Sequence, residues 1–110
     1  HKALQLLRGA AYNGYVPAQL HLGQKYKNGI DMPRNETEAN VWFRKAADMG
    51  NAEAQFSLGE YFALAPTGHG DLAQGLRWLR MAARQNHAEA AALLDKLTNT
   101  EVASEEQQAA

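Results

Sequence analysis

The chain contains no cysteine, no long apolar run and almost no net charge, and each absence excludes a class of function. Without cysteine, the chain forms no disulfide and no thiolate metal site. No apolar run approaches the roughly 20 residues that a membrane-spanning helix needs, so membrane insertion is not expected. Eleven basic and twelve acidic residues leave a formal charge of −1. Such a chain has no strong field to attract nucleic acid, and we expect no nucleic-acid partner.

A 36-residue repeat occupies most of the chain. When residues 10–45 are aligned without gaps to residues 46–81, nine of the 36 positions are identical. The identities fall on alanine, glycine, glutamine, leucine, tryptophan and arginine, and several of these are residues that helix packing selects. Internal periods of this length indicate repeated supersecondary units that stack on one another.

Each period predicts two helices, because apolar residues recur at helical spacing and no useful length alternates with period two. The first helix covers about residues 17–28 and the second about residues 36–49. Small residues are predicted where two helix backbones approach closely, at Gly23, Ala39, Gly59 and Gly75. Two tryptophans 36 residues apart, Trp42 and Trp78, are predicted to fill the space between successive helix pairs.

The helix boundaries also repeat. Asn35 and Asp71 lie 36 residues apart, and each is predicted to cap the start of a helix. Gly14, Gly50 and Asn86 occupy equivalent positions after helices. Glycine and asparagine tolerate the left-handed conformation that ends a helix, so a shared backbone geometry is expected there.

The stretch ANVWFRKAADMGNAEAQFSLGEYF, residues 39–62, resembles a Sel1-like repeat, a relative of the tetratricopeptide repeat. The resemblance covers residues 3–97. It implies an all-α fold, a right-handed α–α superhelix (solenoid) of antiparallel helix pairs with about six helices and a C-terminal tail. The expected parts are a half repeat over 1–13, repeats over 14–49 and 50–85, a terminal helix over 86–97, and a polar, acidic tail or capping helix over 98–110. Asp95 departs from the pattern, since Gly23 and Gly59 occupy the equivalent positions.

The half repeat at the start predicts that the chain is the C-terminal piece of a longer repeat protein. Its helix would lack a partner on one side, which allows self-association through this N-terminal helix. The resemblance implies an adaptor, commonly bacterial and tied to cell-envelope assembly, secretion or signalling. The sequence does not decide between periplasm and cytoplasm.

The first helix of each repeat is expected to line a concave surface that binds a partner's peptide or helix. An angle of 100° per residue places six side chains on that surface, with Phe56 as an exposed anchor. An alternative is that Leu20 and Phe56 pack against the next repeat. The predicted partner-binding residues are Leu20, Gln24, Lys27, Phe56, Glu60 and Lys96.

Other functions receive less support from the sequence. A carbohydrate or peptidoglycan-fragment binding module requires tryptophans and tyrosines in the groove rather than in the core. Arg8, Arg44 and Arg80 recur at the period and form either a basic binding stripe or a solvated face. A structural spacer is a third possibility. The histidines have no metal-ligand spacing, so we expect no catalytic residue, no metal and no cofactor, and therefore no enzyme.

Overall fold

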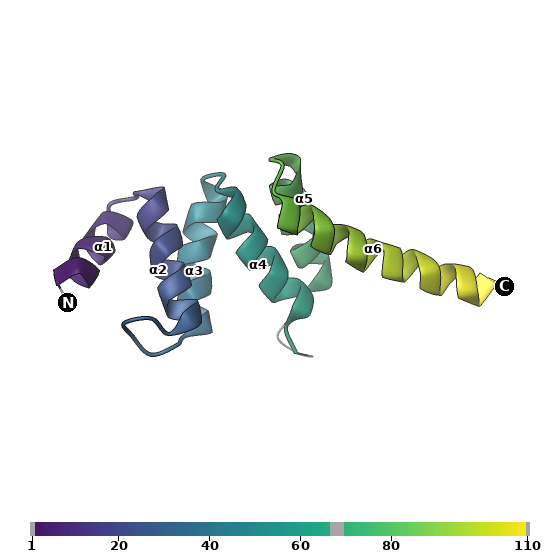
Figure 1. The fold of residues 1–110 in the computed structure, drawn as a ribbon, viewed down its shortest axis with the longest axis horizontal. Helices are drawn as coiled ribbons and strands as arrows, with labels where there is room; N and C mark the ends of the chain where they lie inside the picture. Colours follow the sequence, from purple (N-terminus) through teal and green to yellow (C-terminus); the bar gives the residue numbers. More distant parts are fainter. Residues whose placement is uncertain (1, 67–69, 110) are drawn as a thin grey trace.

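The computed structural model is all-helical and describes residues 2–66 and 70–109, with side chains described to residue 99 (Figure 1). The helices follow one another as sequential antiparallel pairs. Their bounds are α1 Lys2–Tyr12, α2 Val16–Asn28, α3 Glu36–Asp48, α4 Ala52–Leu64, α5 Leu72–Arg84 and α6 Ala88–Ala109. The molecule is elongated, with extents of 61 × 27 × 17 Å, as expected for an array in which each unit contacts its neighbours.

The predicted helix boundaries are confirmed. The Oδ1 atoms of Asn35 and Asp71 accept hydrogen bonds from the backbone N–H groups of Glu38 and Gln74 at 3.0 and 3.1 Å. The sequence reasoning missed a third cap, Asn51, whose Oδ1 accepts from Ala54 N–H at 2.8 Å. The three residues expected to be left-handed, Gly14, Gly50 and Asn86, have φ angles of 90°, 95° and 66°.

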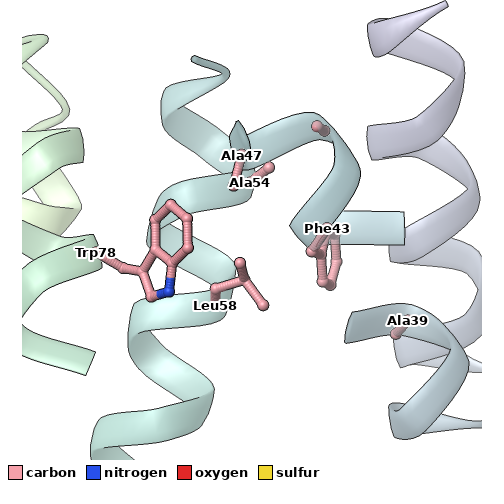
Figure 2. Packing of buried hydrophobic residues seen from close by; sticks show 7 residues of the cluster. Ala39, Phe43, Ala47, Ala54, Leu58 and Trp78 are labelled. Carbon is pink, nitrogen blue, oxygen red and sulfur yellow. The ribbon is translucent and has the colours of Figure 1, made fainter. Parts of the chain in front are cut away.

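Three apolar clusters follow one another along the array, and each tryptophan joins successive helix pairs. Trp42, only 4% exposed, packs on Ala11 of α1 and on Leu22 of α2. Trp78, 8% exposed, belongs to the cluster that contains Phe43 of α3 and Leu58 of α4. Figure 2 shows Leu58 between Trp78 and Phe43, so this cluster extends from α3 through α4 to α5.

The small residues lie where the prediction placed them. A Cβ atom added to Gly59 would lie 2.7 Å from Leu79 Cγ, and one added to Gly75 would lie 2.7 Å from the backbone nitrogen of Ala63. A Cβ on Gly23 would meet the ring of Phe43 at 2.7 Å. The second helix of each repeat is therefore packed closely against the first.

The terminal helix differs from the expectation. It was predicted to end at residue 97 and to be followed by a polar tail or a capping helix, but α6 continues without a break to Ala109. Residues 98–109 contain neither glycine nor proline and are rich in alanine, glutamate and glutamine, so nothing in the sequence stops the helix. Leu93, Leu94 and Leu97 anchor the first part of α6 on the third cluster. No helix in the described part of the chain is long and apolar enough to cross a membrane.

Candidate partner-binding groove

The first helices of the repeats, α2, α4 and α6, together form a depression of about 470 Å³, here called the trough. Charged and amide side chains provide much of its lining. The lining residues are His21, Gln24, Lys25, Lys27 and Asn28 of α2, Ile30 of the following loop, Glu53, Phe56, Ser57 and Glu60 of α4, and Glu89 of α6.

The structure brings Gln24, Lys27, Phe56 and Glu60 of the predicted set together in the trough. Leu20 is half-buried and packs against the central cluster, which includes residues of α4. Lys96 is exposed on α6 and is not part of the trough lining. Whether any of these residues binds a partner stays a prediction.

Phe56 is not the exposed anchor that the sequence reasoning expected. Its side chain is 9% exposed and belongs to the cluster with Leu79, Ala82 and Ala90. Its ring also stacks on His87, with centroids 4.8 Å apart. The helical angle used for the prediction describes one isolated helix, whereas α6 approaches α4 closely enough to cover this side chain. Phe56 thus packs against the next repeat's first helix, as the alternative interpretation expected.

Both lysines that line the trough form ion pairs with carboxylates. Lys27 Nζ lies 3.2 Å from Glu60 Oε1 and links α2 to α4. Lys25 Nζ lies 2.8 Å from Asp31 Oδ2. The hydrogen bond from Lys25, and then its positive charge, hold the pKa of the Asp31 carboxyl below its ordinary value of 3.8.

His87 connects the start of α6 to α4. Its Nδ1 accepts a hydrogen bond from Ala90 N–H at 3.1 Å, so Nδ1 carries no proton and Nε2 is the donor. Nε2 lies 2.7 Å from Glu53 Oε2. The histidine therefore caps α6 and orients a carboxylate of the trough.

A second depression, here called the cavity, lies next to the trough between α3 and α4. It has a volume of about 290 Å³ and its lining is mainly apolar. Residues from three successive helices and from the turn after α4 line it: Lys27, Glu36, Ala39, Asn40, Phe43, Ser57, Glu60, Tyr61, Leu64, Ala65 and Pro66.

The sequence reasoning missed this cavity and much of the trough. Equivalent positions of the repeat could have indicated part of the trough. Glu53 and Glu89 occupy equivalent positions 36 residues apart, and both line the trough. His21 and Ser57 are also equivalent and share the same face. The cavity had no such signal, because three helices and a turn combine to form it.

The aromatic residues are not arranged as the carbohydrate alternative requires, since both tryptophans are in the core. Tyr26 is half-buried against the core, and Tyr12 packs edge-on against Trp42 with ring centroids 5.0 Å apart. Tyr61 lines the cavity, whereas Tyr15 is exposed beside α1. The trough therefore lacks, within the described residues, the exposed tryptophan and tyrosine rings on which a sugar would stack.

The arginine stripe is partly neutralised. Arg44 Nε lies 3.3 Å from Asp48 Oδ1, and the Arg44 guanidinium lies 5.2 Å from the centre of the Trp78 ring. This arrangement is typical of a structural surface pair. No group of three histidine or acidic residues in the described part of the chain is arranged to hold a metal ion, and His69 lies outside the described residues.

The N-terminal helix leaves one apolar side uncovered. Leu6 is 68% exposed, although it occupies the position that Trp42 and Trp78 occupy in the later repeats, where the side chain is buried. Self-association through this helix stays a prediction. Sedimentation of the chain beside a Leu6→Glu variant would test it, because a charge on this side would abolish such an association.

The Sel1 repeat family model matches the chain twice, at residues 16–51 and 52–87. Both matches have the 36-residue period, and each begins two residues later than the expected repeat. Sel1 repeats are modules similar to tetratricopeptide repeats that typically serve as interaction scaffolds and are generally non-catalytic.

Two curated relatives contain related segments. DAP3-binding cell death enhancer 1 of Rattus norvegicus is 38% identical over 76 residues, which are 69% of this chain and 15% of that protein. Chitin synthase regulatory factor 4 of Schizosaccharomyces pombe is 35% identical over 91 residues, which are 82% of this chain and 14% of that protein. The chain thus spans about one seventh of the length of these relatives.

Two solved bacterial structures share the fold. A Sel1 repeat protein from Oxalobacter formigenes has a TM-score of 0.76 and 31% identity, covering 87% of this chain and 72% of that one. The protective antigen c5321 of uropathogenic Escherichia coli, which displays an SLR fold, has a TM-score of 0.76 and 35% identity, covering 80% of this chain and 19% of that one. The repeated match to the family model and the shared fold lead to one conclusion: the chain belongs to the Sel1 repeat family.

Proposed function

We propose that the chain is a protein-interaction module of an adaptor, and that it binds a segment of a partner protein in the groove formed by the trough and the cavity. One observation carries this proposal: the trough and the cavity lie next to each other, and both are lined by the Lys27–Glu60 ion pair. A mainly apolar recess beside a polar, charged rim is the usual composition of a protein-binding surface.

The names of the curated relatives support the same class of function. One is described as binding DAP3 and the other as a regulatory factor of chitin synthase. Neither partner is assigned to this chain. A bacterial, cell-envelope setting is supported only by the bacterial sources of the two solved structures.

The test uses the whole chain as bait in a lysate of its source organism, beside two variants. An Asn40→Trp, Glu89→Lys variant obstructs the cavity and reverses a charge of the trough. An Arg80→Ala variant changes only the arginine stripe. All three proteins are first compared by circular dichroism and thermal unfolding, so that only equally folded chains are used.

We expect a partner that the unmodified chain and Arg80→Ala retain and that the groove variant loses. A partner retained by the groove variant but lost from Arg80→Ala would instead place the binding surface on the arginine stripe. The absence of any saturable partner would favour the structural spacer and contradict the proposal.

A further inference from the structure

The cavity and the trough adjoin along α4 and together make up the groove. They share three lining residues, Lys27, Ser57 and Glu60. The trough begins at Glu53 in the first turn of α4, and the cavity extends past Leu64 at the end of the same helix. A ligand that follows α4 therefore meets two different chemical environments.

The cavity end is suited to one large apolar side chain. Its lining includes Ala39 and Phe43, which are both buried, together with Leu64. The volume of about 290 Å³ lies at the lower limit of the roughly 300–1,000 Å³ typical of small-molecule sites. An apolar anchor in such a recess is the usual centre of a protein–peptide contact.

The trough end presents negative charge. Lys25 and Lys27 are each paired with a carboxylate. Glu89 has no ion pair with any described residue, and Glu53 contacts the side chain of His87. Both glutamates lie in the first turn of a helix, where the helix dipole stabilises a carboxylate but does not neutralise its charge. The charge that remains available to a partner is therefore acidic.

The uncharged polar side chains of the trough are suited to an extended backbone. Gln24 and Asn28 of α2 carry amide groups, and Ser57 of α4 carries a hydroxyl group. These groups both donate and accept hydrogen bonds. The N–H and C=O groups of an extended segment need such partners, whereas a helix has already paired most of its own.

We propose that the groove binds an extended peptide segment that carries one large apolar side chain in the cavity and a lysine or arginine beside Glu53 and Glu89. This inference rests on the proposed function and specifies the chemistry of the partner. Glu53 and Tyr61 lie eight residues apart on α4, which is about 12 Å along a helix. An extended chain advances about 3.3 Å per residue, so roughly three or four residues separate the apolar and the basic side chain.

The test is an array of immobilised eight-residue peptides on a glycine–serine background, probed with the labelled 110-residue chain. Each peptide carries one leucine, phenylalanine or tryptophan and one arginine, glutamate or serine, at separations of one to six positions. Peptides that retain the chain are then titrated by fluorescence anisotropy. We expect the strongest binding from an apolar residue and an arginine about three or four positions apart, and weakening of this binding as salt rises.

Two variants test which end of the groove binds the basic side chain of the peptide and which end binds the apolar one. Glu53→Gln with Glu89→Gln removes both charges, while the amide oxygen introduced at position 53 can still accept the bond from His87. We expect it to weaken the arginine peptide about three- to tenfold and leave the serine peptide unchanged. Asn40→Trp obstructs the cavity, and we expect at least a roughly tenfold loss with every apolar peptide. Asp48→Asn, a loss of charge that is not part of the groove, is the matched control.

Equal binding of arginine and glutamate peptides, or a preference for glutamate, would overturn the charge assignment. Retention of no peptide at all would overturn the peptide proposal. In that case, a lysate partner that the groove variant still loses would preserve the proposed function with a folded surface as the partner. If neither a peptide nor a lysate partner binds, the proposed function itself fails.

Discussion

The carboxamide of Gln85 lies 2.9 Å from Oε1 of Gln55 and joins the end of the second repeat to its beginning. The same Nε2 atom donates to the backbone oxygen of Gly50 at 2.9 Å. Gln55 in turn donates its own Nε2–H to the backbone oxygen of Ala47 at 3.2 Å. Gln55 is buried, so these bonds satisfy a polar side chain that would otherwise be costly.

The first repeat lacks the equivalent donor. Gln19 repeats the bond of Gln55 by donating to Ala11 O at 3.2 Å, but its buried Oε1 has no hydrogen-bond partner among the described residues. The residue 36 positions before Gln85 is Met49, which is 71% exposed and has nearly the same backbone angles. Methionine cannot donate a hydrogen bond, so Met49 cannot give Gln19 the bond that Gln85 gives Gln55.

We predict that Met49→Gln stabilises the chain by about 1 kcal/mol, because it supplies a donor to a buried acceptor. Urea unfolding measures the change. Met49→Ala is the control, since it removes the methionine without adding a carboxamide and should bring no gain from this bond. The reciprocal variant Gln85→Met should destabilise the chain by a similar amount. Equal midpoints for Met49→Gln and Met49→Ala would contradict the assignment.

The close approach of α4 and α5 predicts an order among glycine variants. A Cβ on Gly75 would lie 2.7 Å from Ala63 N and 2.9 Å from Gly59 O, which are backbone atoms that cannot move independently. We predict that Gly75→Ala destabilises the chain by about 1–3 kcal/mol through overpacking. Gly23→Ala should cost less, because the three atoms nearest to its Cβ all belong to the Phe43 side chain, which can shift. Thermal unfolding gives the order.

Gly9→Ala is the matched control for these variants. Gly9 lies inside α1, and a Cβ there would meet nothing within 4 Å. We expect this substitution to stabilise the chain by about 0.5–1 kcal/mol, because alanine favours a helix interior more than glycine does. If Gly75→Ala behaved like Gly9→Ala, close packing would not be the reason for glycine at position 75.

Most of the fold was predictable because the residues that begin and end the helices recur at the same positions of each repeat. Asn35 and Asp71 are capping residues at one spacing, and Gly14, Gly50 and Asn86 share one backbone requirement. These signals depend only on neighbouring residues. The length of α6 was not predicted, because a polar helix without glycine or proline has no marked end in the sequence.

The groove was predictable only where one helix determines it. Gln24 and Glu60 lie in the trough because their position around the helix places them there. The angle around α4 could not decide whether Phe56 is an exposed anchor or packs on the next repeat, because its burial depends on residues of α5 and α6. The cavity was missed for the same reason, since residues of several helices form it.

Two substitutions of His87, at the start of α6, are expected to lower the stability of the chain by different amounts. His87 occupies the position of Asn51, the side-chain cap of α4, 36 residues earlier. We expect His87→Asn to retain a cap but to lose the contact with Glu53 and the stacking on Phe56. His87→Ala loses all three and should be less stable than His87→Asn by about 1 kcal/mol, the usual contribution of a cap. Urea unfolding of both variants provides the comparison, and equal stabilities would show that the cap contributes nothing.

The ion pair between Asp31 and Lys25 predicts a dependence of stability on pH. The pKa of the Asp31 carboxyl lies below the ordinary value of 3.8 because Lys25 donates a hydrogen bond to it and is positively charged. A carboxyl with a lowered folded pKa stabilises the fold above the unfolded pKa, and this contribution is lost as the pH falls through the folded value.

Asp31→Asn isolates that charge, because Asp31 has a left-handed φ of 65° and asparagine tolerates the same conformation. We expect the variant to be slightly less stable than the unmodified chain at about pH 6, and the difference to shrink toward about pH 3 as the carboxyl becomes protonated. Urea midpoints across this range measure it. The exposed ion pair should also weaken in high salt, so a difference that persists at low pH and in high salt would arise from the backbone and not from the charge.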